Sequence, residues 1–250
     1  MEFNIFDIYT DASIDLNKRI GCSGALVVNR KRNEIVKSIF GVKFNATNNM
    51  SEIIAIWLGI YQAIELLYTE QTPFHINLFS DSQISLFGLR EWIYGWINNR
   101  KGNSMIGSSG TVSNQEWFRD CYHAILSSGI KMKLFHQKGH INLNSSKSIY
   151  EADKVFRTSN VNSLRMIGLT PQIVSTYNNL VDEETRKIVQ MVSIHGLSAD
   201  TLARSSNNIR LIGDYSIPME FEFGINELEC YKSQISGGLN YPKIFNGGNK

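Results

Sequence analysis

Cysteine is scarce in this chain of 250 residues, and the three cysteines, Cys22, Cys121 and Cys230, lie far apart. They show no paired metal-ligand spacing, and an odd, scattered set indicates reduced thiols in an intracellular compartment. The amino-terminal stretch MEFNIFDIYTD has no basic region followed by a long apolar run, so it predicts no signal peptide. No apolar run approaches the roughly 18–20 residues that a membrane span needs. These absences predict a cytoplasmic protein.

An excess of charge of one sign is also missing. The chain has 25 Lys and Arg against 23 Asp and Glu, so its formal net charge is only +2. Composition alone therefore does not predict a nucleic-acid binder. Hydrophobic residues make up 42% of the sequence, which is enough for a substantial core in one or two domains.

Apolar alternation, helical periodicity and turn residues predict an α/β layout. Strands are expected at residues 4–10, 24–29, 34–44, 75–81 and 131–136. Helices are expected from near Ser51, within residues 82–99, from a cap at Asn114 to about Ser127, and around Asp153. Residues 101–112 are rich in Gly and Ser and predict an exposed loop. This order of elements places helices on the faces of a mixed sheet.

Four carboxylates stand at positions in these elements where chemistry could use them. Asp11 ends the first strand, Glu52 opens a helix, Asp81 ends the fourth strand, and Asp153 lies in the last of these helices. Acids that converge at a sheet edge repel one another unless cations lie between them, and hard oxygen ligands suit Mg²⁺ or Mn²⁺. Two such ions about 3.5–4 Å apart promote phosphodiester hydrolysis. Taken singly, each acid is better explained as an ordinary turn residue or first-turn helix residue, so the prediction depends on the four acids together.

Five motifs follow one another along the chain. They are YTDAS around Asp11, TNNMSE ending at Glu52, FSDSQIS around Asp81, QKGH ending at His140, and EADK around Asp153. Together they resemble the type 1 ribonuclease H family, and WIYGWINNR and VSNQEW resemble the substrate-handling protrusion of that family. The resemblance covers roughly residues 4–158 and implies a ribonuclease H-like five-stranded mixed sheet flanked by helices.

The resemblance implies an endoribonuclease that hydrolyses the RNA strand of RNA–DNA hybrids and leaves 5′-phosphate and 3′-hydroxyl ends. Asp11, Glu52, Asp81 and Asp153 would hold two Mg²⁺ ions, with Mn²⁺ as the alternative metal. His140 would assist proton traffic or product release, which suits histidine because its ordinary pKa is near neutrality.

The resemblance also implies residues that bind the substrate. The amides of Asn48 and Asn49 donate and accept hydrogen bonds, as a ribose 2′-hydroxyl does, although a simple capped turn explains them too. The other residues implied are Gln83 in the minor groove, Thr47 at a phosphate of the DNA strand, Trp92 and Trp96 on a deoxyribose, and Asn114.

The protrusion departs from the family pattern. Residues 91–112 offer only Arg100 and Lys101 as cations. Because phosphate contacts dominate affinity for nucleic acid, this segment predicts a weak grip on a duplex. Trp92 and Trp96 are four residues apart on one helix face, so they could instead pack against each other in a local core.

Residues 160–250 form a C-terminal extension of unknown role, separate from a catalytic domain at residues 1–159. Helices are expected at residues 181–195, ended by Gly196, and at residues 198–204, whereas residues 236–250 look frayed. Such a pair of helices could bind nucleic acid, but the extension carries 8 Lys and Arg against 9 Asp and Glu. A packing appendage or a surface for a protein partner is the favoured interpretation.

Two other functions remain open at this level. A DNA nuclease or strand-transfer enzyme of the same fold would share the acids but would not need the TNN sequence before Glu52. A non-catalytic nucleic-acid-binding module would usually have lost one or more of the acids, and all four candidates are present.

Overall fold

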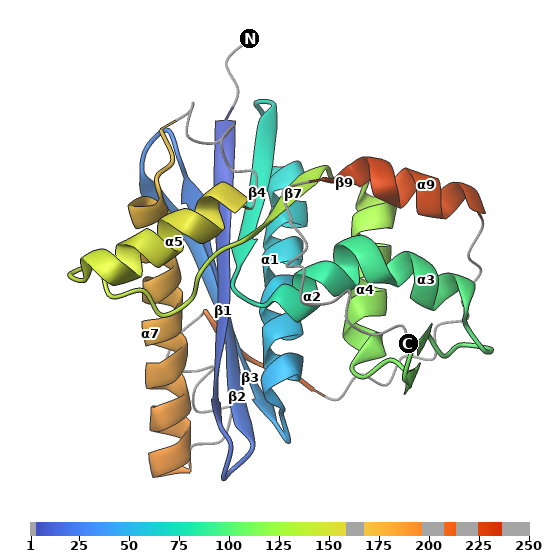
Figure 1. The fold of residues 1–250 in the computed structure, drawn as a ribbon, viewed down its shortest axis with the longest axis horizontal. Coiled ribbons are helices and arrows are strands. Elements are labelled where there is room, and N and C mark those ends of the chain that lie inside the picture. The colour runs from blue at the N-terminus through green and yellow to red at the C-terminus, as the bar shows by residue number, and fades with distance from the viewer. Residues whose placement is uncertain (1–3, 159–167, 197–207, 214–224, 237–250) are drawn as a thin grey trace.

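The computed structural model describes residues 4–158, 168–196, 208–213 and 225–236, and its centre is a mixed β-sheet (Figure 1). Strands β1 (Asn4–Asp15), β2 (Ile20–Asn29) and β3 (Glu34–Phe44) form an antiparallel meander. Strands β4 (Phe74–Ser80) and β7 (Met132–His136) continue the sheet in parallel to β1. The core order β3-β2-β1-β4-β7 confirms the expected five-stranded mixed sheet.

Two short strands from the C-terminal part of the chain extend this sheet to seven strands. β8 (Ile209–Leu211) pairs in parallel with β3, and β9 (Ile235–Ser236) pairs in parallel with β7. Each lies along what would otherwise be an open edge of the five-stranded core, where unpaired backbone groups invite association. The segments that follow residue 159 are therefore built into the sheet.

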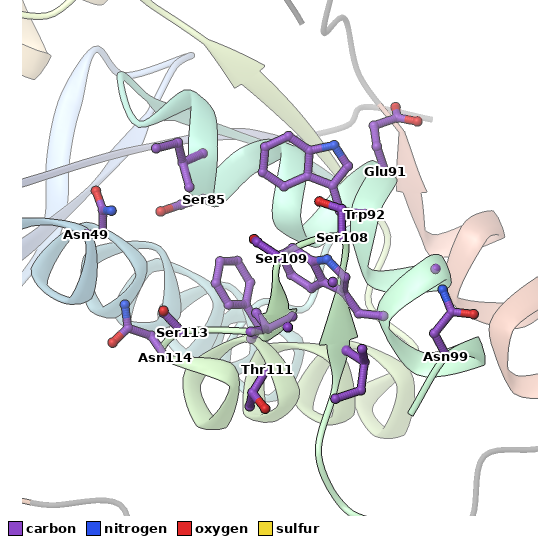
Figure 2. A pocket seen from close by; sticks show the side chains of 18 residues that line it. Asn49, Ser85, Glu91, Trp92, Asn99, Ser108, Ser109, Thr111, Ser113 and Asn114 are labelled. Atoms are coloured by element: carbon purple, nitrogen blue, oxygen red, sulfur yellow. The ribbon is translucent and has the colours of Figure 1, made fainter. Parts of the chain in front are cut away.

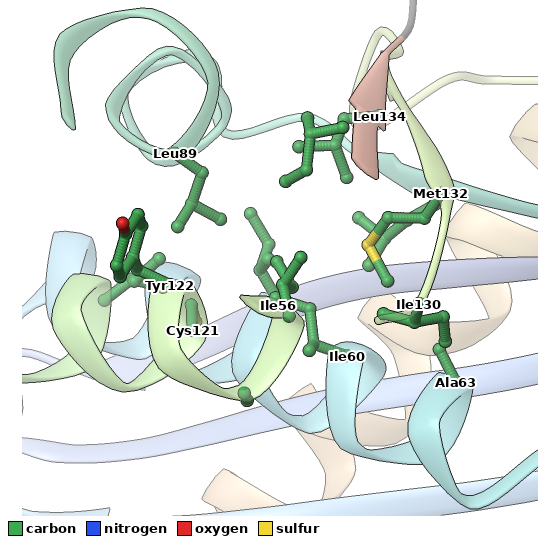
Figure 3. Close-up of a cluster of buried hydrophobic side chains, with 14 of the residues drawn as sticks. Ile56, Ile60, Ala63, Leu89, Cys121, Tyr122, Ile130, Met132 and Leu134 are labelled. Carbon is green, nitrogen blue, oxygen red and sulfur yellow. The ribbon is translucent and has the colours of Figure 1, made fainter. Parts of the chain in front are cut away.

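One face of the sheet is covered by α1 (Asn48–Thr69), and α4 (Gln115–Ser128) packs against α1. Ile56, Ile60 and Ala63 of α1 meet Cys121 and Tyr122 of α4 in the buried cluster of Figure 3. Contrary to the sequence-based expectation, α1 is long and apolar enough to cross a membrane by length and composition alone. Most of its apolar stretch is nevertheless buried inside this fold.

The opposite face of the sheet is covered by α7 (Pro171–His195), as Figure 1 shows. This helix begins well before the expected residue 181, because Thr170 caps it by accepting a hydrogen bond from the Ile173 amide at 3.3 Å. Its end at Gly196, which has a φ of 57°, confirms the expectation. The buried residues that join α7 to the sheet include Val174, Val181, Val192, Tyr9, Phe79 and Phe135.

Two further helices pack around this core. α5 (Ser146–Thr158) packs on α7 and buries Ala152 and Phe156. α9 (Ile225–Gln234) packs on α4. The hydroxyl of its buried Tyr231 also donates a hydrogen bond to the carbonyl of Leu89, which lies in the segment Gly88–Trp92, at 2.9 Å. The expected helix at residues 198–204 and nearly all of the frayed end at residues 236–250 lie outside the described residues.

Several expected boundaries were wrong, and two of them matter for the site. β1 continues to Asp15, so Asp11 lies inside the strand rather than at its end. α1 begins at Asn48, because the Thr47 hydroxyl accepts a hydrogen bond from the Met50 amide at 3.3 Å. Glu52 therefore lies in the second turn of the helix and not in its first.

The protrusion is a compact unit made of α2 (Gln83–Phe87), η1 (Gly88–Trp92), α3 (Ile93–Asn98) and a small hairpin of β5 (Ile106–Gly107) and β6 (Gly110–Thr111). The hairpin corrects the expectation of a plain loop. Trp92 stacks on Phe87 with ring centroids 5.7 Å apart, and Trp96 meets Phe118 edge-on at 5.1 Å. Both indoles thus take part in local packing, as the alternative interpretation held.

Removing the chain after residue 159 should unfold the protein. The truncated chain would lack α7, so the apolar face built by Tyr9, Phe79 and Phe135 would meet water. We expect circular dichroism to show a cooperative thermal transition for the full chain and none for residues 1–159. A cooperative transition of the fragment within a few degrees of the full chain would contradict this packing role of α7.

Candidate active site

Three carboxylates from three different elements meet at one place on the sheet. β1 and β4 are parallel neighbours whose pairing ends at Thr10 and Ser80, so Asp11 and Asp81 stand side by side just beyond it. α1 packs on β1 and β4 and brings in Glu52. One oxygen from each of Asp11, Glu52 and Asp81 lies within 4.8 Å of the other two.

Hydrogen bonds fix one of these acids and leave another open. Asp11 accepts a hydrogen bond from the Ala12 amide at Oδ1, 2.7 Å away, and from the Asn178 side-chain amide at Oδ2, 3.2 Å away. Glu52 Oε2 is buried and has no hydrogen-bond partner among the described residues. A buried carboxylate oxygen without a donor is costly, so the site is set up for a cation or another positive group.

The electrostatics of the three acids are unfavourable in the metal-free protein. Burial raises the pKa of Asp11 well above its usual range, and the charges of Asp81 and Asp182 raise it further. The pKa of Glu52 is raised in the same way, first by burial and then by the neighbouring acids. Burial also raises the pKa of Asp81, while His140 and Lys138 lower it. The ionised forms are therefore disfavoured until positive charge enters.

A fourth acid, Asp182, approaches this cluster from α7. Its charge raises the pKa values of Asp11, Glu52 and Asp81. Its Oδ2 lies 3.4 Å from Nδ1 of His140 and accepts a hydrogen bond from Arg186 at 3.0 Å. The sequence interpretation missed Asp182 altogether.

Polar residues on the buried face of α7 were the signal that could have revealed Asp182. An amphipathic helix normally turns apolar side chains inward. In α7 the positions Asn178, Asp182 and Thr185 lie at helical spacing, and all three are buried. Buried polar side chains on a sheet-facing stripe indicate a site rather than a core.

Asp153 is not among the acids that converge. It lies on α5, where its carboxylate pairs with Arg157 one turn away. Val155 of the same helix lines the cleft beside Glu52 and Asp81, and residues two apart on a helix point about 200° apart. Asp153 is not among the residues that line the cleft, and its role as a metal ligand stays a prediction.

The cluster opens into a cleft of about 690 Å³. Glu52 and Asp81 line it together with four residues of the predicted substrate set, which are Asn48, Asn49, Gln83 and Trp92. His140, predicted as a catalytic residue, and Lys138 line it too. The cleft therefore brings together two of the acids and most of the predicted substrate-binding residues.

A second pocket, of about 760 Å³, adjoins the cleft along the protrusion (Figure 2). Asn49 and Trp92 line both spaces, and Trp96 and Asn114 line the second one. Asn114 stands at the start of α4 in the left-handed conformation, with a φ of 56°, and its side chain makes no capping hydrogen bond. Asn114 thus occupies the expected N-cap position of α4, but its side chain does not supply the capping hydrogen bond.

Two assignments in the predicted substrate set change in detail. Asn48 and Asn49 belong to the first turn of α1 and not to the loop before it. The Thr47 hydroxyl accepts the hydrogen bond that caps α1, and Thr47 does not line either pocket. The position of Thr47 before the asparagines therefore orients the helix that carries Glu52.

His136, which the sequence interpretation did not select, also lines the cleft. Its Nδ1 lies 3.4 Å from the side-chain nitrogen of Gln83. Burial lowers the pKa of His136 to about 4, so this imidazole is neutral at physiological pH. A neutral ring can accept the hydrogen bond from Gln83 and thereby hold that amide in place.

The residues of the cluster suit a hard divalent cation. Mg²⁺ and Mn²⁺ prefer carboxylate oxygens, and an acidic group of three with a buried open oxygen supplies them. Asp11, Glu52 and Asp81 could hold such an ion, and Asp182 lies near enough for its charge to raise their pKa values.

Comparisons with known proteins agree with the order of these motifs. The RNase H family model matches residues 4–158, a stretch that ends before α7. A ribonuclease H of Rickettsia bellii (strain RML369-C) is 32% identical over 148 residues, which cover 59% of this chain and 84% of that protein. Ribonuclease HI of Campylobacter jejuni is 37% identical over 91 residues, which cover 36% of this chain and 56% of that protein.

Solved structures give more distant likenesses. LC11-RNase H1 in complex with an RNA/DNA hybrid has 16% sequence identity and a TM-score of 0.41, covering 60% of this chain and 99% of that one. The foamy viral protease-reverse transcriptase in complex with double-stranded DNA has 14% identity and a TM-score of 0.42, covering 61% of this chain and 90% of that one.

Replacing Glu52 by Gln should stabilise the metal-free protein. Because burial raises the folded-state pKa of Glu52, the folded protein binds more protons than the unfolded chain above the ordinary pKa, and stability falls as pH rises through that window. Glu52→Gln removes this loss, so we expect a gain of about 1 kcal/mol near pH 8 and none near pH 4.

Urea unfolding with EDTA at several pH values measures this difference. Addition of Mg²⁺ should stabilise the wild type and leave Glu52→Gln much less affected, because ligands that bind only the folded state raise its stability. Equal stability of both proteins at pH 8 without metal would show that the cluster carries no electrostatic strain.

Proposed function

This chain belongs to the RNase H family, and we propose that it hydrolyses the RNA strand of RNA–DNA hybrids with two divalent cations, leaving 5′-phosphate and 3′-hydroxyl ends. The observation that carries the proposal is the convergence of Asp11, Glu52 and Asp81 with a buried, unpartnered oxygen of Glu52. Mg²⁺ is the proposed metal, and Mn²⁺ would satisfy the same oxygen ligands.

We assign the fourth carboxylate of the site to Asp182 in place of Asp153. The charge of Asp182 raises the pKa values of all three other acids, whereas Asp153 is not among the main charges that cause those shifts. Under this assignment α7 belongs to the catalytic unit, and the catalytic domain extends beyond residue 159.

Bound cations would supply an activated water and positive charge at the leaving oxygen. The protein's own contribution is to hold the carboxylates rigidly before the substrate arrives. Asp11 is fixed by two hydrogen bonds, and α1 holds Glu52 from within the main core. His140, whose side chain is 75% exposed and lies beside Asp182, is placed to exchange protons with solvent during turnover.

Recognition of RNA would rest on the amide side chains that line the cleft. Asn48 and Asn49 lie in the first turn of α1, where their amides and the helix N-terminus face a polyanion favourably. Gln83, which His136 holds, lies on the same cleft and can read the minor groove. The DNA strand would follow the pocket lined by Trp92, Trp96 and Asn114.

Cleavage assays on matched hybrid, duplex DNA and duplex RNA test this function. We expect Mg²⁺-dependent cutting of the RNA strand of the hybrid and products with 3′-hydroxyl ends that a polymerase can extend. Asp11→Asn should lower the cleavage rate at least about 10²-fold, because it removes a negative group that holds the cations. Preferential cutting of duplex DNA, or equal rates for wild type and Asp11→Asn, would exclude the proposal.

A matched pair of substitutions tests the fourth ligand. Asp182→Asn should lower hybrid cleavage at least about 10²-fold and weaken Mn²⁺ binding measured by calorimetry. Asp153→Asn breaks a helix-surface ion pair and should change both quantities by less than about twofold. The reverse ranking would restore Asp153 to the site.

A further inference from the structure

Residues Gln137, Lys138, Gly139 and His140, called here the 137–140 segment, leave the end of β7 and line the cleft. The segment starts rigidly, because the Gln137 amide donates a hydrogen bond to the carbonyl of Ser80 at 3.0 Å and so continues the pairing of β7 with β4. His140 was selected from the sequence as a proton carrier. The three-dimensional surroundings of the segment indicate a wider role.

The first contact of the segment leads to Asp11. Gln137 and Asn178 are both buried, and the Gln137 side-chain amide donates a hydrogen bond to Oδ1 of Asn178. Asn178 in turn donates from Nδ2 to Oδ2 of Asp11 at 3.2 Å. Since Gln137 occupies the oxygen of Asn178, it fixes which end of that amide faces Asp11.

The second contact is with Asp81. A Cβ atom added to Gly139 would lie 2.9 Å from Cγ of Asp81 and 3.2 Å from its Cβ, and it would overlap the carboxylate oxygen Oδ2. Gly139 is not among the described glycines with positive φ, so an alanine there would be acceptable to the backbone. The residue is limited to glycine by the close approach of the Asp81 carboxylate.

The third contact is with Asp182. Nδ1 of His140 lies 3.4 Å from Oδ2 of this acid on α7. One segment of four residues thus reaches the surroundings of carboxylates that come from β1, from the end of β4 and from α7.

We propose that the 137–140 segment is a positioning clamp that sets the relative placement of Asp11, Asp81 and Asp182, and that Gln137, Gly139 and Asn178 are positioning residues for the metal site. This inference rests on the proposed function in taking the acids as ligands of divalent cations. Gly139 provides the space for Asp81, and the Gln137–Asn178 pair orients Asp11. Residues that orient metal ligands typically change metal affinity about 10–100-fold when altered.

Gly139→Ala is the decisive variant, and Gly213→Ala is its matched control, since an added Cβ at Gly213 meets nothing within 4 Å. We expect Gly139→Ala to raise the Mn²⁺ dissociation constant, measured by calorimetry on the full chain, about 10–100-fold. The Mn²⁺ concentration for half-maximal hybrid cleavage should rise in parallel, while KM for the hybrid at saturating metal changes little. Gly213→Ala should match the wild type.

A double-mutant cycle tests the route to Asp11. Gln137→Ala and Asn178→Ala should each weaken Mn²⁺ binding, and adding Gln137→Ala to Asn178→Ala should have no further effect, because Gln137 acts through Asn178. Asn178→Asp, which replaces the donor by an acceptor in the same volume, should be at least as damaging as Asn178→Ala. Additive effects of Gln137→Ala and Asn178→Ala on Mn²⁺ affinity would overturn this part of the clamp.

The outcomes separate the clamp from the proposed function. If the wild type binds Mn²⁺ but does not cut hybrids, the function fails and the calorimetric comparison still decides on the clamp. If the wild type binds no Mn²⁺, a metal-free crystal structure of Gly139→Ala decides, with a displaced Asp81 carboxylate as the expected result. An unmoved Asp81 carboxylate, or unchanged Mn²⁺ affinity of Gly139→Ala, overturns the clamp.

Discussion

Repulsion among buried carboxylates is the physical constraint on which the rest of this structure depends. Like charges within about 5 Å repel by roughly 3 kcal/mol at the effective dielectric constant of a protein interior. Asp11, Glu52 and Asp81 are held within that distance, and burial adds to the cost of ionising them. Such a cluster persists only where strong packing elsewhere holds it, and it is relieved by cations. The same unfavourable field would be relieved most by a small, highly charged metal ion.

The hydrophobic cores on the two faces of the sheet supply that packing. α7 contributes apolar residues to one of these cores and polar residues to the surroundings of the acids. Its apolar residues close the sheet face that carries Tyr9 and Phe79, while its buried Asn178 donates a hydrogen bond to Asp11 and its Asp182 acts on the acids through its charge. α7, which follows residue 159 in the chain, thus stabilises the sheet and adds polar side chains near the acids. The strands β8 and β9 at the two sheet edges reinforce this union of the C-terminal segments with the core.

The lining of the cleft combines two kinds of residues. The first turn of α1 and Gln83 present amide groups of the kind that recognise a ribose. The 137–140 segment lies against the acids. The protrusion adds indole rings that pack on one another and on the core, so its contact surface is aromatic and rigid rather than basic.

The sequence alone determined the five core strands, the central helix, and three acids of the site. Alternation and helical periodicity indicate which face of each element is buried. The motifs around Asp11, Glu52 and Asp81 are short contiguous stretches, so they can be identified from the sequence. Only the tertiary structure revealed a further acid near these three. Asp153 stands in a family-like motif but belongs neither to the acidic group of three nor to the lining of the cleft, whereas α7 lies on the sheet and places the buried Asp182 where its charge raises the pKa values of the other acids. Local spacing specifies where a side chain points on its own helix, and only long-range packing specifies which helix reaches the sheet.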